Sequence, residues 1–320
     1  MIYLLTILFL MVAIISVLVL IKPVLMGALA YNFTIKSEAK YYGFKKSSIE
    51  INDIKISYYH NTCRPKKDRD EETETILMLH GFSADKNVWL RFARYFRSEY
   101  NIIIPDLAGH GETGFKRHWG YSAHEQAKLL ASFVEKLKIE KLHIIGNSMG
   151  GFIAAHFALI YPQKLLTMTL VDAAGVKSPE MSKMEHLLVQ GINPFEINTR
   201  EDFDQFYSMT MAKPPWMPHF ILSAIAKKYQ RDRKQLMFIW SQFVNPNDML
   251  DSCLHNISIP VLLVWGGQDQ IIHVSSSTIW QSKINNAKVH IFPEIGHMPM
   301  VETPKATAFV YKNFLNNITK

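Results

Sequence analysis

Cysteine is scarce in this chain of 320 residues, which contains only Cys63 and Cys253. Two cysteines so far apart in the sequence provide neither a disulfide framework nor the ligand spacing of a zinc site. The scarcity is consistent with a reducing compartment, although one disulfide between the two cysteines remains open.

Basic residues are missing from the start of the chain. No lysine or arginine precedes Lys22, and the stretch Ile2–Ile21 is almost wholly apolar. Because a helix of about 20 apolar residues spans a bilayer core, we predict a transmembrane anchor within residues 1–30. A cleaved signal peptide, which would leave a secreted or periplasmic protein, is the alternative, since Ala28-Leu29-Ala30 resembles a cleavage site. However, the run exceeds the usual signal core of about 7–15 residues and lacks a basic residue before it.

The overall charge is positive, with a formal net charge of +7 and a pI of about 9.2. No nucleic-acid-binding motif accompanies this charge, so we expect no nucleic-acid partner and favour an anionic membrane surface. The first basic residues all follow the apolar run, and the positive-inside rule then places the folded domain on the cytoplasmic face. These residues are Lys22, Lys36, Lys40, Lys45 and Lys46.

Four further segments have recognisable patterns. Residues 31–44 are interpreted as an amphipathic connector. Residues 47–51 and 54–59 alternate in polarity and predict a β-hairpin. Residues 61–74 are rich in charge and predict a solvated loop.

Strand and helix patterns alternate through the rest of the chain. The strand patterns occupy 75–79, 101–105, 142–145, 165–171, 261–265 and 289–292. Helical patterns follow at about 87–97, 122–138, from 149, and at 275–283 and 303–315. This alternation predicts an α/β fold with a mostly parallel sheet covered by helices on both faces, built from residues 31–172 and 251–320.

The alternation stops between residues 173 and 250, where the pattern is helical and rich in methionine and aromatic residues. We interpret this segment as a helical cap inserted over the carboxyl edge of the sheet, where ligands of such folds bind. Its apolar residues either form the core of the cap or line a pocket for an acyl chain. They include Met184, Phe203, Phe206, Tyr207, Met209, Met211, Trp216 and Trp240.

A strand-to-helix turn at Gly146-x-Ser148-x-Gly150 carries the first candidate catalytic residue. Glycines on either side of the serine allow a tight, strained turn that exposes the serine hydroxyl. The amino end of the following helix adds a partial positive charge, which suits a reaction that develops negative charge. Ser148 is therefore the candidate nucleophile.

A serine nucleophile needs a base, and the base needs an orienting carboxylate. Asp269 and His297 each follow a late predicted strand, at the same sheet edge as Ser148, and are the candidate acid and base. Asp172 also ends a strand and is the competing acid. His80 and His110 lie in loops near the site and are equally open to a supporting or a structural role.

Stabilisation of the oxyanion requires two backbone donors. The N–H group of Met149 directly follows the candidate nucleophile. The N–H group of Phe82, in the loop after His80-Gly81, is the candidate second donor.

Five motifs together resemble the α/β-hydrolase superfamily from about residue 45 onward: His80-Gly81-Phe82, Asp106-x-x-Gly109-x-Gly111, the turn at Ser148, Trp265-Gly-x-x-Asp269 and Gly296-His297-x-x-x-x-Glu302-x-Pro304. With the apolar N-terminal run, the chain most resembles the membrane-anchored monoacylglycerol lipases. The resemblance implies the Ser148, Asp269 and His297 triad, the Phe82 and Met149 oxyanion donors, a lipid ester as substrate, and neither a cofactor nor a metal.

Two other functions remain open. Serine hydrolases that cleave carbon–carbon bonds of ring-fission products carry a similar Gly-Asn-Ser-Met-Gly-Gly. A hydrolase-fold binding protein without catalytic activity is the third, although the complete set of candidate catalytic residues argues against it.

Overall fold

The structure, a computed structural model, describes residues 5–7, 9, 17, 20–61 and 73–318. The apolar stretch Ile2–Ile21 lies largely outside these residues, as do Cys63 and most of the charge-rich loop predicted at 61–74. None of the helices within the described part combines the length and apolar character that crossing a bilayer requires. Cys253 is a free, partly exposed thiol.

An eight-stranded sheet forms the centre of the molecule, in the order β1-β2-β4-β3-β5-β6-β7-β8. The hairpin predicted at 47–59 is present as β1 and β2, and β2 also runs antiparallel to β4, whereas all the remaining pairs are parallel. The prediction of a mostly parallel sheet is therefore confirmed. The strands are β1 (Phe44–Ile51), β2 (Ile54–Asn61), β3 (Thr75–Leu79), β4 (Asn101–Pro105), β5 (Leu142–Asn147), β6 (Leu165–Val171), β7 (Val261–Gly266) and β8 (Ala287–Phe292).

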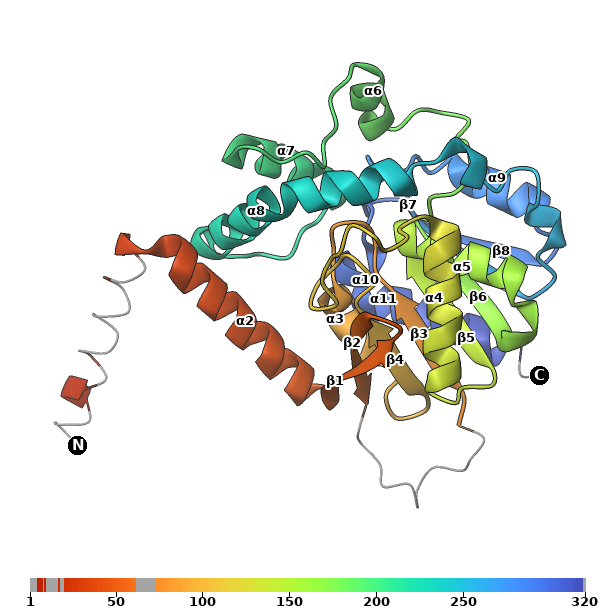
Figure 1. Ribbon diagram of the computed structural model, residues 1–320, viewed down its shortest axis with the longest axis horizontal. Coiled ribbons are helices and arrows are strands. Elements are labelled where there is room, and N and C mark those ends of the chain that lie inside the picture. The colour runs from red at the N-terminus through yellow and green to blue at the C-terminus, as the bar shows by residue number, and fades with distance from the viewer. Residues whose placement is uncertain (1–4, 8, 10–16, 18–19, 62–72, 319–320) are drawn as a thin grey trace.

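Helices cover both faces of this sheet (Figure 1). Every residue of β3, β5 and β7 is buried, as expected for parallel strands enclosed on both sides. One core contains Phe133, Phe157 and Trp280, and the other contains Trp89 and Tyr311. The helices concerned are α4 (Ala123–Lys136), α5 (Met149–Ile160) and α9 (Ser276–Lys283) on the first side, and α3 (Leu90–Ala93), α10 (Pro299–Glu302) and α11 (Pro304–Asn316) on the second.

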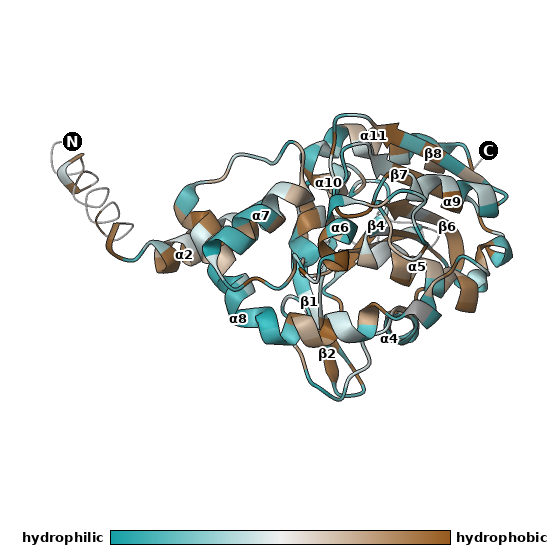
Figure 2. Ribbon diagram, turned by 90° about the horizontal axis from the view of Figure 1, so that it is seen from above, coloured by the Kyte–Doolittle hydropathy of each residue, from teal (hydrophilic) through white to brown (hydrophobic). Residues whose placement is uncertain are grey.

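Three α-helices lie between β6 and β7 in the sequence and above the sheet in Figure 1. They are α6 (Lys183–Val189), α7 (Arg200–Thr210) and α8 (His219–Phe243). In Figure 2 the ribbon of α8 has long hydrophilic segments, whereas β6 is hydrophobic. The buried residues of α7 and α8 are mostly apolar, among them Phe203, Phe206 and Ile239, whereas α6 has no buried residue.

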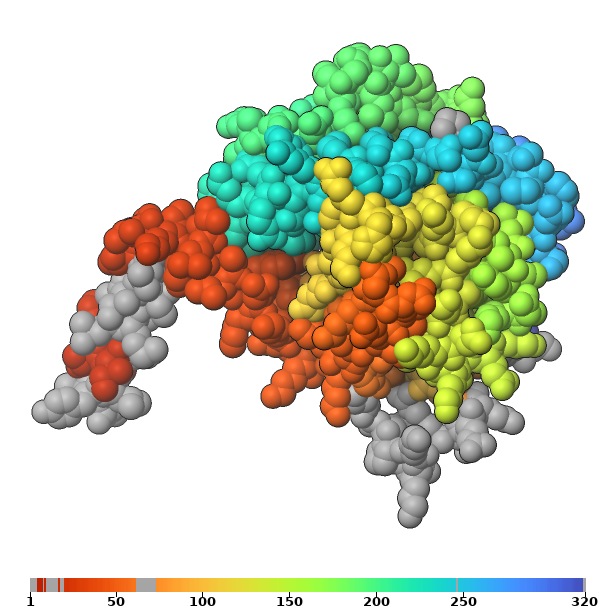
Figure 3. Space-filling view, in the orientation of Figure 1, coloured from red at the N-terminus to blue at the C-terminus, as the bar shows by residue number. Residues whose placement is uncertain are grey.

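The N-terminal helix α2 (Pro23–Tyr41) replaces the connector expected at residues 31–44, and it runs across the boundary expected at residue 30. Proline at its first position suits a helix start, and Gly43, with a φ of 79°, provides the left-handed residue just past its end. No proline lies between them, and Gly27 is the one glycine inside the helix. At Gly27 the helix approaches α8 so closely that a Cβ atom would lie 2.1 Å from the carbonyl oxygen of Phe220. Figure 3 shows the two helices in contact.

Candidate active site

Ser148 occupies a strained turn between β5 and α5, as the Gly-x-Ser-x-Gly pattern predicts. Its φ of 55° and ψ of −118° are unusual for a residue other than glycine. A Cβ atom on Gly146 would lie 2.2 Å from the Gly150 carbonyl oxygen, and one on Gly150 would lie 2.4 Å from that of Leu79. Only glycine fits at both positions, so the local sequence fixes the serine at the amino end of α5.

Asp269 and His297 are brought together by the loops after β7 and β8. His297 Nδ1 and Asp269 Oδ2 are 2.7 Å apart. The other oxygen of the carboxylate, Oδ1, accepts hydrogen bonds from the N–H groups of Ile271 at 2.7 Å and Ile272 at 3.0 Å. Because the carboxylate can only accept from Nδ1–H, it favours the imidazole tautomer in which Nε2 is free to accept a proton.

A hydrogen bond joins the loop that carries His297 to the end of β5, next to Ser148. Asn147 Nδ2, in the residue before the serine, donates to the carbonyl oxygens of His297 at 3.0 Å and Val171 at 3.1 Å. Glu302 Oε1 accepts from the N–H of Gly296 at 2.9 Å. Asn147 and Glu302 belong to the sequence motifs, but nothing in the sequence indicates that they position the histidine.

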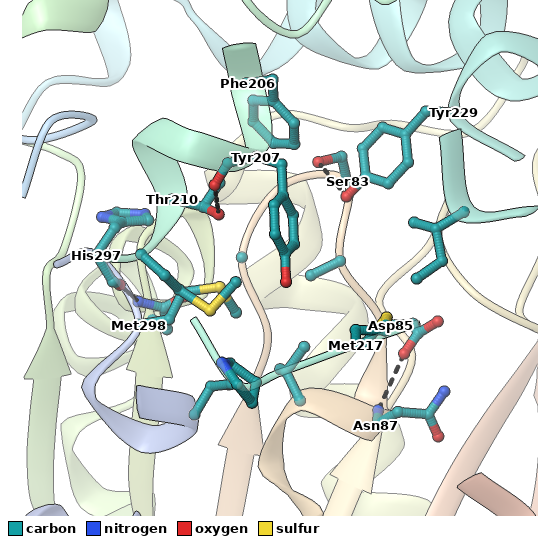
Figure 4. A pocket seen from close by; sticks show the side chains of 18 of the residues that line it. Ser83, Asp85, Asn87, Phe206, Tyr207, Thr210, Met217, Tyr229, His297 and Met298 are labelled. Carbon is teal, nitrogen blue, oxygen red and sulfur yellow. Dashed lines mark hydrogen bonds between the residues drawn. The ribbon is translucent and has the colours of Figure 1, made fainter. Parts of the chain in front are cut away.

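Ser148 and His297 both line one cavity of about 270 Å³. Figure 4 shows His297 at one side of this cavity, with Tyr207 of α7 projecting into it and Tyr229 of α8 beyond. Most of the other lining side chains are apolar, among them Phe203, Phe206, Met211 and Met217. The candidate nucleophile and base therefore open onto a space suited to a hydrocarbon chain.

The loop with the candidate oxyanion donor Phe82 lies against the serine. A Cβ atom on Gly81 would lie 3.2 Å from Ser148 Cβ. The second candidate donor, Met149, is the first residue of α5. Within residues 73–318, neither the Phe82 nor the Met149 N–H donates a backbone hydrogen bond, so both remain free to bind an oxyanion.

His80 and His110 support this loop. His80 Nε2 accepts from the Leu107 N–H at 3.0 Å, and its Nδ1 lies 2.8 Å from the Gly81 carbonyl oxygen. His110 packs edge-on against Phe82, and burial together with neighbouring His80 lowers the pKa of His110 to about 3. Both side chains connect the Phe82 loop to the end of β4.

Asp172, the competing acid, lies near Asp269 and His297, but among the described residues its carboxyl group forms no hydrogen bond with the imidazole. Its Oδ1 accepts from the Gly266 N–H at 2.8 Å, and its buried Oδ2 has no hydrogen-bond partner among the described residues. Burial, reinforced by the nearby Asp269 carboxylate, raises the pKa of Asp172 well above its ordinary value. The protonated, neutral form is therefore favoured.

A metal site at these residues is not supported by their hydrogen bonding. Ligand atoms of Asp172, Asp269 and His297 lie within 4.8 Å of one another, the one such grouping in the described part of the chain. However, the 2.7 Å separation of His297 Nδ1 and Asp269 Oδ2 matches a hydrogen bond, and an Nδ1 that carries the donated proton has no lone pair to offer an ion.

A second apolar cleft, of about 320 Å³, also reaches Ser148. Its wall includes Met184, Leu188 and Trp240 from the segment 173–250. Some of the apolar residues in that segment thus line clefts, whereas Met209 is a core residue. Helix α2 unexpectedly contributes Tyr31, Ile35 and Glu38 to the first cavity.

Comparison with known proteins connects this site to lipases. Lipase 1 of Psychrobacter immobilis is 32% identical over 290 residues, covering 90% of both chains. Monoacylglycerol lipase ABHD6 of Mus musculus is 28% identical over 281 residues, covering 83% of both. The crystal structure of a membrane phospholipase A, described as a novel bacterial virulence factor, matches with a TM-score of 0.86 and 29% identity over 100% of both chains.

These relatives give the enzyme class, carboxylic-ester hydrolase. The sequence also matches the profile of the alpha/beta hydrolase fold over residues 74–196 and 174–304. Since these two ranges include well over half of the sequence, the chain belongs to the α/β-hydrolase family.

Proposed function

We propose that this enzyme hydrolyses carboxylic esters of lipids, with Ser148 as nucleophile, His297 as general base and Asp269 as the orienting acid. The observation that carries the proposal is the 2.7 Å contact between Asp269 and His297 at a cavity that Ser148 also lines. A monoacylglycerol is the proposed substrate, because ABHD6 is a monoacylglycerol lipase and the two clefts at Ser148 are largely apolar.

The proposed reaction gives each of these groups one role. Ser148 Oγ attacks the ester carbonyl carbon while His297 Nε2 takes the hydroxyl proton, and Asp269 stabilises the imidazolium that forms. The N–H groups of Phe82 and Met149 donate to the negatively charged oxygen. His297 then protonates the leaving alcohol, which gives an acyl-enzyme. Water activated by His297 attacks the acyl carbon and releases the fatty acid.

Replacement Ser148→Ala tests the nucleophile, with Ser132→Ala, an exposed helix residue, as the matched control. The first variant should lose hydrolysis of p-nitrophenyl and monoacylglycerol esters while keeping its thermal unfolding temperature, and the second should keep both. A folded Ser148→Ala enzyme that retains esterase activity would exclude the assignment. Lack of labelling of the natural enzyme by a fluorophosphonate would instead favour the non-catalytic binding protein.

Assay of ring-fission dienones separates the carbon–carbon hydrolase from the esterase. Two solved hydrolases of ring-fission products resemble this chain at 22% and 17% identity, a level that establishes the shared fold alone. Turnover of the dienone faster than any ester would replace the proposed reaction with carbon–carbon cleavage.

We also propose that residues 1–30 anchor the enzyme in a membrane, with core segments 31–172 and 251–320 and the cap 173–250 on the cytoplasmic side. Apolar side chains exposed at the start of the described chain support this interpretation: Leu20, Ile21, Val24, Leu25, Leu29 and Phe33. Carbonate extraction, protease protection and intact mass of the expressed protein provide the test. A mass without residues 1–30 would indicate signal cleavage instead.

A further inference from the structure

Ser148 lies where two spaces of the enzyme meet: the catalytic cavity of about 270 Å³ and the second apolar cleft of about 320 Å³. Three apolar side chains, Phe82, Phe195 and Ile271, also line both spaces. The backbone of Phe82 carries a candidate oxyanion donor as well. An ester carbonyl bound at this junction therefore has both spaces beside it, one for its acyl chain and one for its alcohol.

The position of His297 distinguishes the two spaces. His297 lines the catalytic cavity, and it is not among the described residues that line the second cleft. In the proposed reaction the alcohol oxygen leaves with the electrons of its bond to carbon and takes a proton from His297 Nε2. A general acid must lie within about 2.6–3.2 Å of the atom that it protonates. The alcohol therefore belongs on the side of the catalytic cavity, which leaves the second cleft for the acyl chain.

The lining of the second cleft suits a hydrocarbon chain. Two of its polar side chains already bond to the backbone: Ser178 Oγ donates to the Glu180 carbonyl oxygen at 2.6 Å, and Glu185 Oε2 accepts from the Ser182 N–H at 2.7 Å. The larger part of the lining is apolar and includes Phe152, Ala174, Val176, Met184, Leu188, Trp240, Phe243, Val244, Met249 and Ile272. Such a lining gains from contact with methylene groups.

The catalytic cavity offers polar partners for an alcohol. Ser83 Oγ donates to the Tyr229 hydroxyl at 3.4 Å, and the Asp85 carboxylate also lines the cavity. Figure 4 shows these three side chains on the side of the cavity away from His297. The hydroxyl groups of a glycerol can therefore find hydrogen-bond partners in this space.

The wall that α6 contributes to the second cleft is incompletely packed. Met184 and Leu188 are four residues apart and so share one face of the helix. Both are half-buried, and α6 has no buried residue at all. The adjacent Val189 is 78% exposed and lines neither space. An acyl chain in the second cleft would cover apolar surface of α6 that the protein itself leaves partly exposed.

We propose that the second cleft binds the acyl chain and the catalytic cavity binds the alcohol, so that Met184 and Leu188 determine which acyl lengths the enzyme accepts. This inference deepens the proposed function and rests on it. Ser148 Oγ forms a bond to the carbonyl carbon, the bond from that carbon to the alcohol oxygen breaks, and the serine proton passes through His297 to that oxygen. The alcohol then leaves from the cavity, and water can reach His297 while the acyl chain stays in the second cleft.

The test uses the full chain with Leu188→Trp, which fills part of the second cleft, and Met217→Trp, which fills part of the catalytic cavity. Val189→Trp, which adds the same side chain to the outer face of α6, is the matched control. One substrate series keeps glycerol and lengthens the acyl chain from butanoyl to decanoyl. The other keeps the butanoyl group and lengthens the alcohol from methyl to octyl. All esters stay below the concentration at which they aggregate.

In the natural enzyme kcat/KM should rise with acyl length, by up to about fourfold for each added methylene group, until the second cleft is full. In Leu188→Trp the decanoyl-to-butanoyl ratio of kcat/KM should fall at least about tenfold, because the indole occupies the space of several methylene groups. The octyl-to-methyl ratio should stay at its natural value. Met217→Trp should lower the octyl-to-methyl ratio instead, and Val189→Trp should change neither ratio.

A fall of the octyl-to-methyl ratio in Leu188→Trp, equal falls of both ratios, or no fall in either would overturn the assignment of the second cleft. Leu188→Ala enlarges the cleft and should move the best acyl chain to a greater length. If Leu188→Trp does not fold, an unmoved optimum in Leu188→Ala overturns the assignment by itself. A natural enzyme that hydrolyses these esters regardless of acyl length would refute the cleft alone, whereas one that hydrolyses none of them would refute the proposed function.

Discussion

The substitution Asp172→Asn tests whether Asp172 is a neutral, buried carboxyl group or the acid that orients His297. The Asp172 side chain is fully buried, and its Oδ1 accepts from the Gly266 N–H at 2.8 Å. Burial, followed by the Asp269 charge, raises its pKa. Asparagine preserves the acceptor and neutrality and adds an N–H donor, so kcat/KM at pH 7 should stay within about threefold of the natural value.

Alanine at the same position should behave differently. Asp172→Ala leaves the buried Gly266 N–H without its acceptor, which costs about 1–3 kcal/mol of unfolding free energy. Asp172→Asn retains that hydrogen bond and should unfold at a urea concentration close to that of the natural enzyme at pH 5. The difference between the two variants measures the structural role of the side chain.

The pH dependence of stability gives an independent check on Asp172. A raised pKa means that the folded state binds the proton more tightly than the unfolded state. The resulting stabilisation is complete below the unfolded pKa of about 3.9 and is lost as the pH rises through the folded pKa. Asp172→Asn does not titrate, so its stability relative to the natural enzyme should increase between pH 5 and pH 8. Asp269, Glu302 and His297, which face this carboxyl, are present in both proteins.

A catalytic role for Asp172 would give the opposite kinetic result. Asparagine in place of the triad aspartate of a serine protease lowers kcat by about 10⁴. A loss of this size in Asp172→Asn, together with an active Asp269→Asn, would assign the acid to Asp172 and refute the reasoning. Circular dichroism of both variants controls for misfolding.

Three further substitutions test the framework of the site. Gly146→Ala places a Cβ atom 2.2 Å from a backbone oxygen and should lower the unfolding free energy by at least about 2 kcal/mol in a urea titration, and an unchanged midpoint would contradict the tight turn. Asn147→Ala removes a 3.0 Å donor to the His297 carbonyl and should lower kcat about tenfold with little change in KM, whereas a pure KM effect would argue against positioning. Lys86→Met leaves the buried Asp106 charge without its partner and should cost about 3–5 kcal/mol in thermal unfolding, and near-natural stability would show that the pair is dispensable.

The strands and the strand-to-helix turn could be predicted because their signals are local. Buried parallel strands read as continuous apolar runs, and the close contacts at Gly146 and Gly150 require glycine whatever the rest of the fold does. The prediction of one helix at 87–97 is only partly confirmed, because a 3-10 helix (Lys86–Trp89) precedes α3, which has four residues. Bonds from Tyr95 N to Phe92 O and from Phe96 N to Ala93 O tighten the chain after it.

The position of α2 could not be predicted, because it depends on a contact between segments about 200 residues apart. Nothing in the sequence marks Gly27 as special. The need for glycine there is evident only from the structure, because a Cβ atom would collide with the backbone of Phe220. The contribution of α2 to the cavity at Ser148 follows from that packing. The excess of lysine was visible in the composition, but its concentration on two facing helices was not.

The sequence left two aspartates as candidate acids because both follow strands that end at the same edge of the sheet. The structure separates them by loop length. Asp172 comes one residue after β6, and its N–H still donates to Val264 of β7 at 2.9 Å, so its carboxyl remains within the sheet. Asp269 comes three residues after β7, beyond Gly267, whose N–H is bound to Phe292 of β8 at 2.8 Å. That turn carries the Asp269 carboxyl over the strand ends to the imidazole. In this chain the longer loop after β7 brings the Asp269 carboxylate within 2.7 Å of His297 Nδ1, whereas the Asp172 carboxyl, directly after β6, binds the Gly266 N–H instead.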